Sequence, residues 1–413
     1  MYGTLALSQR SIDDLRQAAG GDAIDELRKL SRPIEGLRVL NLSVTGFGTG
    51  TAELLSSSVP LLSDLGIDAH WQVVRASEDF THVSRAMYQA LGGVSVHWTQ
   101  DMTDTWLRYA SMNADLLTEP FDVIVVHDPQ PVAMRSFARE ETSAKWVMHS
   151  HLDLSSAQDD VWMQLRNHIE KFDAAIFDAP AFSRPDISLE TYIVPPAIDP
   201  NSARNMPLPD DVVHSILAQY GLDPSKPIIC HVSPCDAESD LCGVVDVWER
   251  VRERHPDAQL VFVLTTEPQD PQGRSCFEDV ARRTQAEPSA FIVSCGSEIG
   301  NVELNVFQRS ASVVVQKGLR KGFGLWVSDA LWKERPCVVA PAGGLAEQVV
   351  DGESGIIART TAEFADAVIR VLDDPALAAR LGKHGRQHVA DHFLVTRYLR
   401  DYLVILDELH RKK

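Results

Sequence analysis

The sequence predicts an α/β protein made of two doubly wound domains, because short apolar runs alternate with amphipathic stretches in two separate series. The chain has 413 residues, and at about 150 residues per domain this length suggests two or three domains. Its 44% apolar and 23% charged residues are typical of a compact globular protein. Buried parallel strands read as continuous apolar runs, and strands that alternate with helices indicate βαβ units.

Residues 1–35 come before the first apolar run. Apolar side chains recur there at helical spacing, at Ile12, Leu15, Ile24 and Leu27. We therefore expect an N-terminal helical extension that precedes the compact part of the chain.

The first series of apolar runs predicts a domain over residues 36–203. Three prolines, at positions 195, 196 and 200, then interrupt the pattern and predict a linker near residues 195–210. A helix is expected at 52–65. The expected strands are 38–42, 122–127, 145–149 and 174–178.

The second series predicts another domain of the same style over residues 204–385. Closing helices follow from about 375 to 409, where apolar residues again have helical spacing. The expected strands are 227–233, 259–264, 291–295, 313–316, 336–340 and 355–358.

The net charge and the composition limit the kinds of partner that the chain is expected to bind. A formal net charge of −19 argues against nucleic acid or an anionic membrane surface as the main partner, because both select basic faces. No apolar run reaches the length of a membrane span, and the N-terminus lacks the features of a signal peptide, so a cytoplasmic location is expected. The six cysteines form no C-x-x-C pair, which favours reduced thiols over a disulfide framework and predicts no metal site.

A glycine-rich loop runs into a predicted helix near residue 326. Gly318, Gly322 and Gly324 leave backbone N–H groups accessible where a phosphate could lie at the helix N-terminus. The same pattern also fits a plain turn between a strand and a helix.

Seven segments, in this order and spacing, carry a family resemblance. They are GFGTGTAELL (46–55), VHDPQP (126–131), HSHLDLSS (149–156), VPPAIDP (194–200), LNVFQRS (304–310), RKGFGLWVSDALW (320–332) and AGGLAEQVVDGESG (342–355). With them the chain resembles retaining glycosyltransferases of the two-domain GT-B type. It is most similar to the nucleotide-sugar-dependent trehalose glycosyltransferring synthases, over nearly all of the sequence beyond residue 35.

The resemblance implies two Rossmann-like domains that face a central cleft, with residues 386–413 packing back on the first domain. It implies a carbohydrate-metabolism enzyme that transfers a hexose from a nucleoside diphosphate sugar to glucose or a similar small acceptor, with the anomeric configuration retained. No cofactor is required in this interpretation, and Mg²⁺ would enter with the nucleotide. Related transferases often dimerise, so a homodimer is compatible with the resemblance.

Acceptor-binding residues carry over from the first domain. Gly48 and Gly50 match a glycine loop that lets the backbone approach the substrates, although a tight turn explains them as well. Asp128 and Gln130 follow a predicted strand, at the sheet edge where open α/β sheets bind ligands. Without the resemblance, Asp128 before a proline would read as a turn.

The catalytic candidates are His151 and Asp153, which follow the next predicted strand. The matching histidine of the family faces the reactive centre near the donor sugar. A single histidine is more often structural, and here the match of residues 152–156 favours the functional interpretation.

Donor binding is expected in the second domain, but the charged positions of the motif differ. Family members place two glutamates eight positions apart, where this chain has Lys321 and Asp329. Lys321 cannot accept a hydrogen bond from a sugar hydroxyl, whereas Asp329 could accept one from ribose. The expected donor-binding residues are Lys317, Arg320, Lys321, Gly322, Phe323, Gly324, Leu325 and Asp329.

A second departure lies in residues 233–243. Family members carry an arginine and a lysine here that hold the donor diphosphate, whereas this chain has Pro234, no lysine, and the acidic residues Asp236, Glu238 and Asp240. Each close charge pair is worth about 1–3 kcal/mol in a partly dry site. We hypothesise that Lys317, Arg320 and Lys321 supply part of the missing positive charge, with a solvated basic loop as the alternative.

Three functional interpretations follow. The first is a trehalose synthase-like transferase with an altered donor site, and the second is a phosphorylase or a transferase with another donor. The third is a catalytically silent binding or regulatory protein, which would make the chain a glycosyltransferase in fold only. The fold alone does not decide among them. The donor base, the donor sugar and the acceptor are not specified by the sequence.

Overall fold

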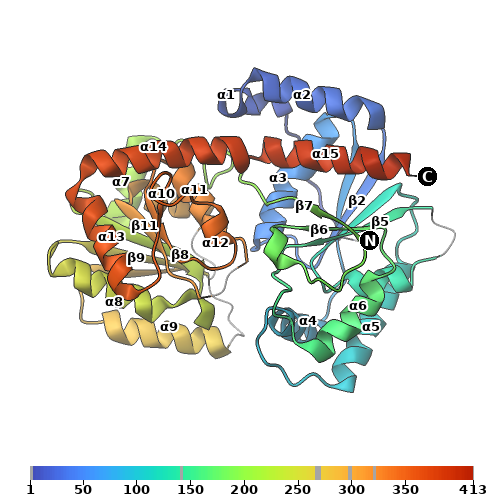
Figure 1. Cartoon of the computed structure of the whole chain (residues 1–413), viewed down its shortest axis with the longest axis horizontal. Helices are drawn as coiled ribbons and strands as arrows, with labels where there is room; N and C mark the ends of the chain where they lie inside the picture. Colours follow the sequence, from blue (N-terminus) through green and yellow to red (C-terminus); the bar gives the residue numbers. More distant parts are fainter. Residues whose placement is uncertain (1–2, 140–142, 266–270, 296–299, 320–321, 413) are drawn as a thin grey trace. The chain divides into compact units, whose positions relative to one another are not determined.

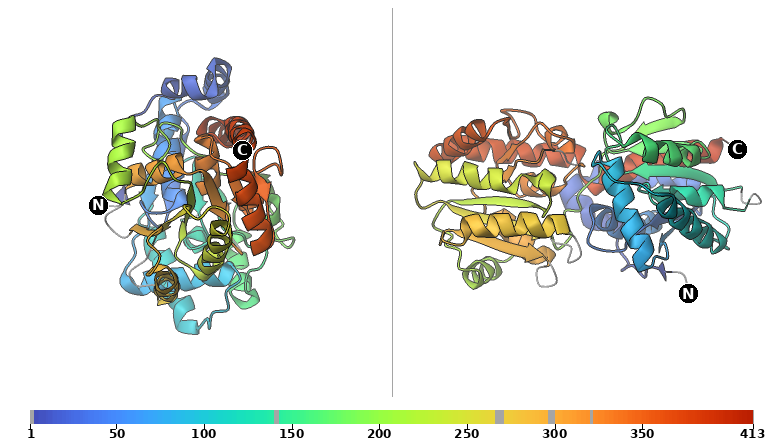
Figure 2. Two further views of the ribbon diagram at one scale, coloured as in Figure 1. Left: turned by 90° about the vertical axis from the view of Figure 1, so that its left-hand side faces the viewer. Right: turned by 90° about the horizontal axis from the view of Figure 1, so that it is seen from below.

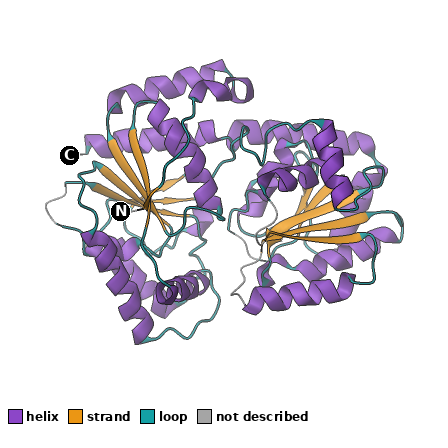
Figure 3. Ribbon diagram, turned by 180° about the vertical axis from the view of Figure 1, so that it is seen from behind, coloured by secondary structure: helices purple, strands orange, loops and turns teal. Residues whose placement is uncertain are grey.

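The computed structural model describes residues 3–139, 143–265, 271–295, 300–319 and 322–412. These residues form two compact units. One consists of Met1–Ala197 and Val395–Lys413, and the other of Ile198–Leu394. Each unit is a sheet with helices on its faces, as Figures 1 and 3 show. The predicted α/β class with two doubly wound sheets is confirmed.

The first sheet has the order β1-β3-β2-β4-β5-β6-β7, and its neighbouring strands are parallel except β1 and β3. The four predicted strands are present as β2, β4, β5 and β6. The other strands were missed because their sequences are polar and have no continuous apolar run. The strands are β1 (Gly3–Thr4), β2 (Arg38–Ser43), β3 (Asp68–Val73), β4 (Val123–His127), β5 (Lys145–Ser150), β6 (Ala174–Phe177) and β7 (Glu190–Ile193).

Helices cover both faces of this sheet. The predicted helix at 52–65 is α3, which Thr49 caps by accepting a hydrogen bond from the backbone of Ala52. The α-helices are α1 (Arg16–Ala19), α2 (Gly21–Ser31), α3 (Gly50–Asp64), α4 (Glu78–Leu91), α5 (Gln100–Asp115), α6 (Asp159–Ile169) and α15 (Val395–Arg411). The short 3₁₀ helices are η1 (Ile12–Leu15), η2 (Arg32–Ile34), η3 (Val132–Ser136) and η4 (Pro180–Phe182).

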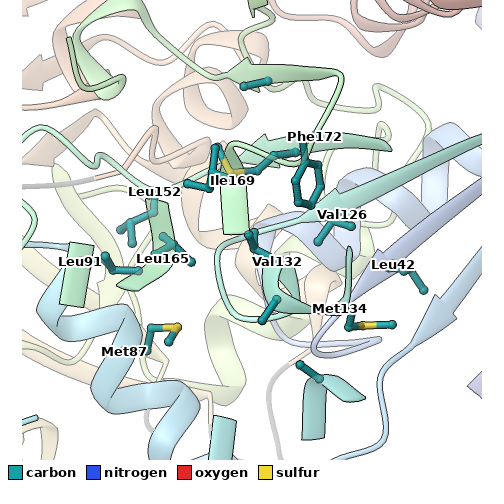
Figure 4. Close-up of a cluster of buried hydrophobic side chains, with 14 of the residues drawn as sticks. Leu42, Met87, Leu91, Val126, Val132, Met134, Leu152, Leu165, Ile169 and Phe172 are labelled. Carbon is teal, nitrogen blue, oxygen red and sulfur yellow. The ribbon is translucent and has the colours of Figure 1, made fainter. Parts of the chain in front are cut away.

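Successive side chains of β4 point to opposite faces of the sheet, so the apolar core is divided between these two faces. Ile124 and Val126 pack into a cluster with side chains of α4, α5 and α6, whereas Val123 and Val125 pack with α2, α3 and α15. Figure 4 shows part of the first cluster, where Val126 lies among Leu42 of β2 and other buried apolar side chains. Because both faces are covered, β4 carries apolar residues without interruption from Val123 to Val126.

The N-terminal helices belong to the core of the first unit and do not precede it, contrary to the expectation of a separate extension. The side chains of Ile12, Leu15 and Ile24 are fully buried, in one cluster with Tyr402 and Leu403 of α15. The amphipathic pattern was correctly recognised, but its apolar stripe covers one face of the sheet together with α15.

The second sheet is entirely parallel, with the order β10-β9-β8-β11-β12-β13. All six strands were predicted. They are β8 (Ile228–Pro234), β9 (Gln259–Thr265), β10 (Ala290–Cys295), β11 (Val313–Gln316), β12 (Cys337–Val339) and β13 (Ile356–Ile357). The helices are α7 (Asp210–Gln219), η5 (Ala237–Ser239), α8 (Leu241–Arg252), α9 (Pro271–Thr284), α10 (Asn301–Ser310), α11 (Trp326–Trp332), α12 (Gly344–Glu347), α13 (Thr361–Asp373) and α14 (Pro375–His392). Figure 2 shows the layers of each unit from two further directions.

The C-terminal segment changes units later than residue 386. Arg386, near the end of α14, lies with its guanidinium over the Trp332 ring of the second unit, 4.2 Å from the ring centre. The part that packs on the first unit begins at Val395. There Arg397 donates to the carbonyl of Pro195 at 2.6 Å, and Tyr402 bonds to Asn41 of β2.

Two further expectations concern the described part of the chain. None of the helices there is both long and apolar enough to cross a bilayer. The cysteines whose side chains are described, Cys230, Cys235, Cys242, Cys276 and Cys337, are all free thiols.

Candidate functional site

The loops that follow β2, β4, β5 and β6 bring polar side chains to one edge of the first sheet. This edge is formed by the carboxyl ends of parallel strands, where open α/β sheets bind ligands. Asp128 follows β4, His151 follows β5, and Asp178 follows β6. Three residues that are distant in sequence therefore lie in adjacent loops.

Asp128 connects these loops. One carboxylate oxygen accepts the Thr51 hydroxyl of α3 at 3.1 Å, and the other accepts the backbone N–H of His151 at 3.3 Å. Its own N–H donates to the carbonyl of His149 at 2.9 Å. The residue has φ 67°, a left-handed conformation that aspartate tolerates better than most side chains. Burial raises its pKa. Asp128 thus fixes the ends of β4 and β5 against the start of α3.

The glycine loop before α3 is open. Gly48 has φ 76°, which favours glycine, and a Cβ at Gly48 or Gly50 would meet no atom within 4 Å. Phe47 beside it is 83% exposed. Among the described residues, no atom lies within 4 Å of a Cβ at either glycine, which is what a substrate-approach role needs.

Gln130 and Asp153 have different surroundings. Gln130 is buried, and its side-chain oxygen has no hydrogen-bond partner among the described residues, which leaves one acceptor available. Its backbone carbonyl accepts the Trp106 indole N–H at 2.7 Å. Asp153 accepts the N–H of Ser155 at 2.9 Å, a local turn contact that accounts for the residue without a ligand.

His151 is the centre of a buried polar chain. Its Nδ1 lies 2.9 Å from Asp178 Oδ1, and its Nε2 lies 3.1 Å from His127 Nδ1. The other nitrogen of His127 contacts Asn41 Oδ1 at 3.0 Å, and Tyr402 of α15 donates to the same oxygen at 2.9 Å. The chain of contacts thus runs from the C-terminal helix to the loop after β6.

The ionisation states follow from these contacts. Burial alone would lower the pKa of His151, but the adjacent Asp178 carboxylate raises it to about 9. Burial and the neighbouring charged imidazole lower the pKa of His149 to about 4, and burial also holds the pKa of His127 well below its usual value. Although burial opposes it, the contact with His151 lowers the pKa of Asp178. His151 and Asp178 therefore form an ion pair beside two neutral imidazoles.

In the second unit, charged side chains near the ends of β8 and β11 pair with each other. Asp240, at φ 46°, accepts the N–H of Gly243 at the start of α8, and it also binds the ammonium group of Lys317. The N–H of Leu319 donates to the Glu238 carbonyl at 2.8 Å, so the two loops are tied together. The positive charge of Lys317 is thus paired within the protein.

The donor-motif residues 322–325 surround a buried glutamine. The side-chain amide of Gln348 donates to the carbonyls of Phe323 and Gly324, at 2.6 and 3.2 Å. Phe323 is buried, and Gly324 has φ 67°. Leu325 immediately precedes α11, and Gly322 begins this described stretch. Arg320 and Lys321 lie outside the described residues.

Asp329 points into the second unit. Its carboxylate accepts the side-chain amide of Asn205 at 2.8 Å and lies 3.6 Å from the Arg204 guanidinium, with the side chain only 2% exposed. Lys333 donates to Asn205 at 2.8 Å, and burial lowers its pKa to about 7. Asp329 Oδ2 has no hydrogen-bond partner among the described residues, so one buried acceptor stays unused beside the Arg204 guanidinium.

Several members of the first site were not predicted from the sequence. His127, His149 and Asp178 lie at the ends of predicted strands, so their position was a usable signal. Asn41 and Tyr402 gave none, because their contact joins residues 361 positions apart. A hollow of about 500 Å³ lies elsewhere, beside β3, and shares no residue with this site.

Comparison with known proteins places the chain in a class. Residues 41–184 match the family model described as trehalose synthase, N-terminal domain, and residues 214–388 match glycosyl transferases group 1. A UDP-forming trehalose-phosphate synthase from Burkholderia xenovorans superposes with a TM-score of 0.71 at 14% identity, over 91% of this chain and 99% of its own. The fold is that of the two-domain GT-B glycosyltransferases.

Sequence relatives define the family within that class. The trehalose synthase of Rubrobacter xylanophilus is 34% identical and that of Pyrococcus horikoshii 32%, each match covering 97% of both chains. The chain belongs to the trehalose synthase family. A trehalose phosphorylase of Pleurotus pulmonarius is 24% identical over 92% of this chain and 59% of its own length.

Proposed function

We propose that the protein transfers a hexose from a nucleoside diphosphate sugar to glucose or a similar acceptor, with retention of the anomeric configuration. The observation that carries this proposal is the set of strand-end loops of the first unit, held together by Asp128 in a chain that matches trehalose synthases over 97% of its length. In this proposal the acceptor is bound beside Gly48, Gly50 and Gln130.

A diphosphate leaving group requires positive charge or backbone donors near the donor phosphates. Lys317 is paired with Asp240, so it contributes little until that pair opens. The N–H groups of the glycine loop and the start of α11, together with Arg320 and Lys321, are the remaining candidates in this segment. Mg²⁺ would be bound through the nucleotide, because residues 233–243 carry acidic side chains but no recognisable metal-binding motif.

The variant Lys321→Glu tests whether the basic cluster, formed by Lys317, Arg320 and Lys321, supplies charge to the donor phosphates. If the cluster supplies phosphate charge, this reversal weakens nucleotide binding by roughly tenfold, measured by calorimetric titration. Unchanged nucleotide affinity would show that the loop is only solvated. Lys226→Glu, at an exposed position of the same unit, serves as the control for net charge.

Phosphorolysis is a second candidate, favoured by the paired Lys317 and by the phosphorylase relative. A phosphorylase needs a site for inorganic phosphate only, so the loss of two family cations would matter less. This reaction breaks the glycosidic bond of a disaccharide and forms a sugar phosphate and a free sugar.

One mass-spectrometric experiment separates these functions. The purified protein is incubated with glucose and a panel of nucleoside diphosphate glucoses, and separately with trehalose and inorganic phosphate. The proposal predicts a new disaccharide and a free nucleoside diphosphate in the first reaction. A sugar phosphate in the second reaction alone would establish the phosphorylase. Nucleotide-sugar binding without turnover in either would support a silent binding protein.

A further inference from the structure

The proton positions in the chain of contacts from Tyr402 to Asp178 can be assigned one by one. The side-chain nitrogen of Asn41 donates to the carbonyl of His70 at 3.3 Å, which fixes the orientation of the amide. Its oxygen then faces Tyr402 and His127, at 2.9 and 3.0 Å. Because an amide oxygen cannot donate, both neighbours must, and His127 carries its proton on Nε2.

The next contact joins two ring nitrogens. His127 Nδ1 lies 3.1 Å from His151 Nε2, the ring planes differ by 8°, and the ring centres are 5.4 Å apart. That separation is as large as this N–N distance permits for two five-membered rings. The two nitrogens therefore lie on the line between the ring centres, and their in-plane orbitals point directly at each other.

A neutral His151 does not fit this arrangement. Its Nδ1 faces the Asp178 carboxylate at 2.9 Å, which requires an N–H there. Its Nε2 would then carry a lone pair aimed at the lone pair of His127, at hydrogen-bonding distance. Two lone pairs repel, so the gap must contain a proton.

We propose that His127 is a positioning residue that holds His151 as an imidazolium, with one N–H donated to Asp178 and the other to His127. Asn41 and Tyr402 take part because they fix the tautomer of His127. His151 then supplies positive charge and a fixed ring orientation, and it has no lone pair for accepting a proton. The catalytic consequence, which rests on the proposed function, is that His151 is not the general base for the acceptor hydroxyl.

The surrounding groups agree with a single positive charge at His151. Asp178 and Asp128 supply two carboxylates from the loops after β6 and β4, and the raised pKa of His151, about 9, follows from the first of them despite burial. His149 of β5 has its ring centre 4.2 Å from that of His151, and its own lowered pKa keeps it neutral. From α15, Tyr398 stacks on His149, and burial raises the pKa of both Tyr398 and Tyr402, so neither adds charge.

A metal ion is the competing explanation, because His127, His149 and His151 each offer a ring nitrogen within 4.8 Å of the others. Two imidazoles on one ion lie about 2.0–2.1 Å from it, with lone pairs that converge at an angle. Here two lone pairs are collinear and their nitrogens are 3.1 Å apart, which leaves room for a proton but not for an ion between them.

The test is nitrogen NMR of the full chain with ¹⁵N-labelled histidine, read through long-range correlations to ring protons. The 14 histidines are resolved by comparison with His151→Gln, which removes one set of signals. The proposal predicts that both nitrogens of His151 are protonated at neutral pH and that His127 is protonated on Nε2 only. An unprotonated His151 nitrogen at neutral pH would overturn it, as would stoichiometric Zn²⁺ binding that displaces the Nε2 proton.

Variants at position 127 test the positioning role. His127→Leu removes the acceptor and should lower the titration point of His151 by roughly one pH unit. His127→Asn keeps an acceptor oxygen and should restore most of that shift. His149→Phe is the control for the neighbouring imidazole: it removes the contact of His149 Nε2 with Asp178 Oδ1 at 3.5 Å but keeps both polar contacts of His151, so it should leave both His151 protons in place. An unchanged His151 titration in folded His127→Leu would refute the role of His127. If that variant does not fold, the wild-type spectrum still decides the protonation state.

Discussion

In both units the carboxyl ends of the parallel strands form one edge of the sheet, but the charges there are arranged differently. In the first unit, Asp128 and His151 hold several loops in place while the nearby glycine backbone stays open. In the second unit, Asp240 pairs with the charge of Lys317, and the buried Asp329 accepts a hydrogen bond from Asn205 and faces Arg204. Asp240 therefore reduces the positive charge near the ends of β8 and β11 in two ways. It is negatively charged itself, and it pairs with Lys317.

The largest expected effect is at Asp128. Asp128→Ala leaves the Thr51 hydroxyl and the His151 N–H without their acceptor, so we expect a loss of about 2–4 kcal/mol in unfolding free energy and about 100-fold in kcat/KM for the acceptor. Urea unfolding and steady-state kinetics measure the two effects. Asp128→Asn is the matched control, since its amide can bond to both groups. Wild-type stability and kinetics for the alanine variant would contradict the linking role of Asp128.

The ion pair of His151 and Asp178 predicts a pH dependence of stability. The pKa of His151 is raised from 6.5 to about 9 on folding, so its contribution is fully present below pH 6.5 and is lost as the pH rises through about 9. The loss amounts to about 3 kcal/mol. Unfolding midpoints in urea between these pH values give the slope, and His151→Gln should flatten it. A wild-type slope that matches the variant would refute the ion pair.

At Asp329 the comparison predicts a structural effect rather than a ligand effect. Asp329→Asn removes the charge that faces Arg204 and the buried Lys333, which should cost about 2 kcal/mol of stability. Nucleotide affinity should change by less than about twofold, because in this arrangement the carboxylate serves the interior. Thermal unfolding and calorimetric titration report on both. A preserved stability with a tenfold weaker nucleotide would instead support ribose binding by Asp329.

The smallest expected effect is at the ion pair between Asp240 and Lys317 in the second unit. Asp240→Asn keeps an acceptor for the N–H of Gly243 but releases Lys317, so nucleotide binding should tighten by roughly tenfold. Asp236→Asn removes an anion from the same loop without releasing Lys317 and is the matched control. Equal gains from both variants would mean that net charge matters and the pair does not.

Much of the fold could be predicted from the sequence because parallel strands covered on both faces are apolar throughout. β9 has such an apolar run from Leu260 to Leu264 and β4 has one from Val123 to Val126, whereas β3 begins at an exposed aspartate and gave no signal. The role of the N-terminal helices was misread, because amphipathicity identifies a helix but not the surface that its apolar face covers. Ile12 is buried in the same cluster as side chains of α15, and no local sequence pattern reveals a contact between such distant segments.

The candidate site was predictable only where residues lie directly at strand ends. Asp128 and His151 were found in this way, and Asp178 could have been. The pairing of Lys317 with Asp240 was not foreseen, because the sequence shows two opposite charges 77 positions apart and not the contact between them. The Asn41 to Tyr402 contact was equally out of reach, since no local pattern links a strand to a helix at the other end of the chain.

The most direct test of the proposed transfer is the rate of disaccharide formation at low donor concentration, for wild type and for Asp240→Asn. Glucose and the panel of nucleoside diphosphate glucoses are supplied, and products are followed by mass spectrometry. We expect both proteins to make a disaccharide from the same donor, and Asp240→Asn to have the higher kcat/KM for that donor with an unchanged KM for glucose. No disaccharide from either folded protein would contradict the proposed transfer.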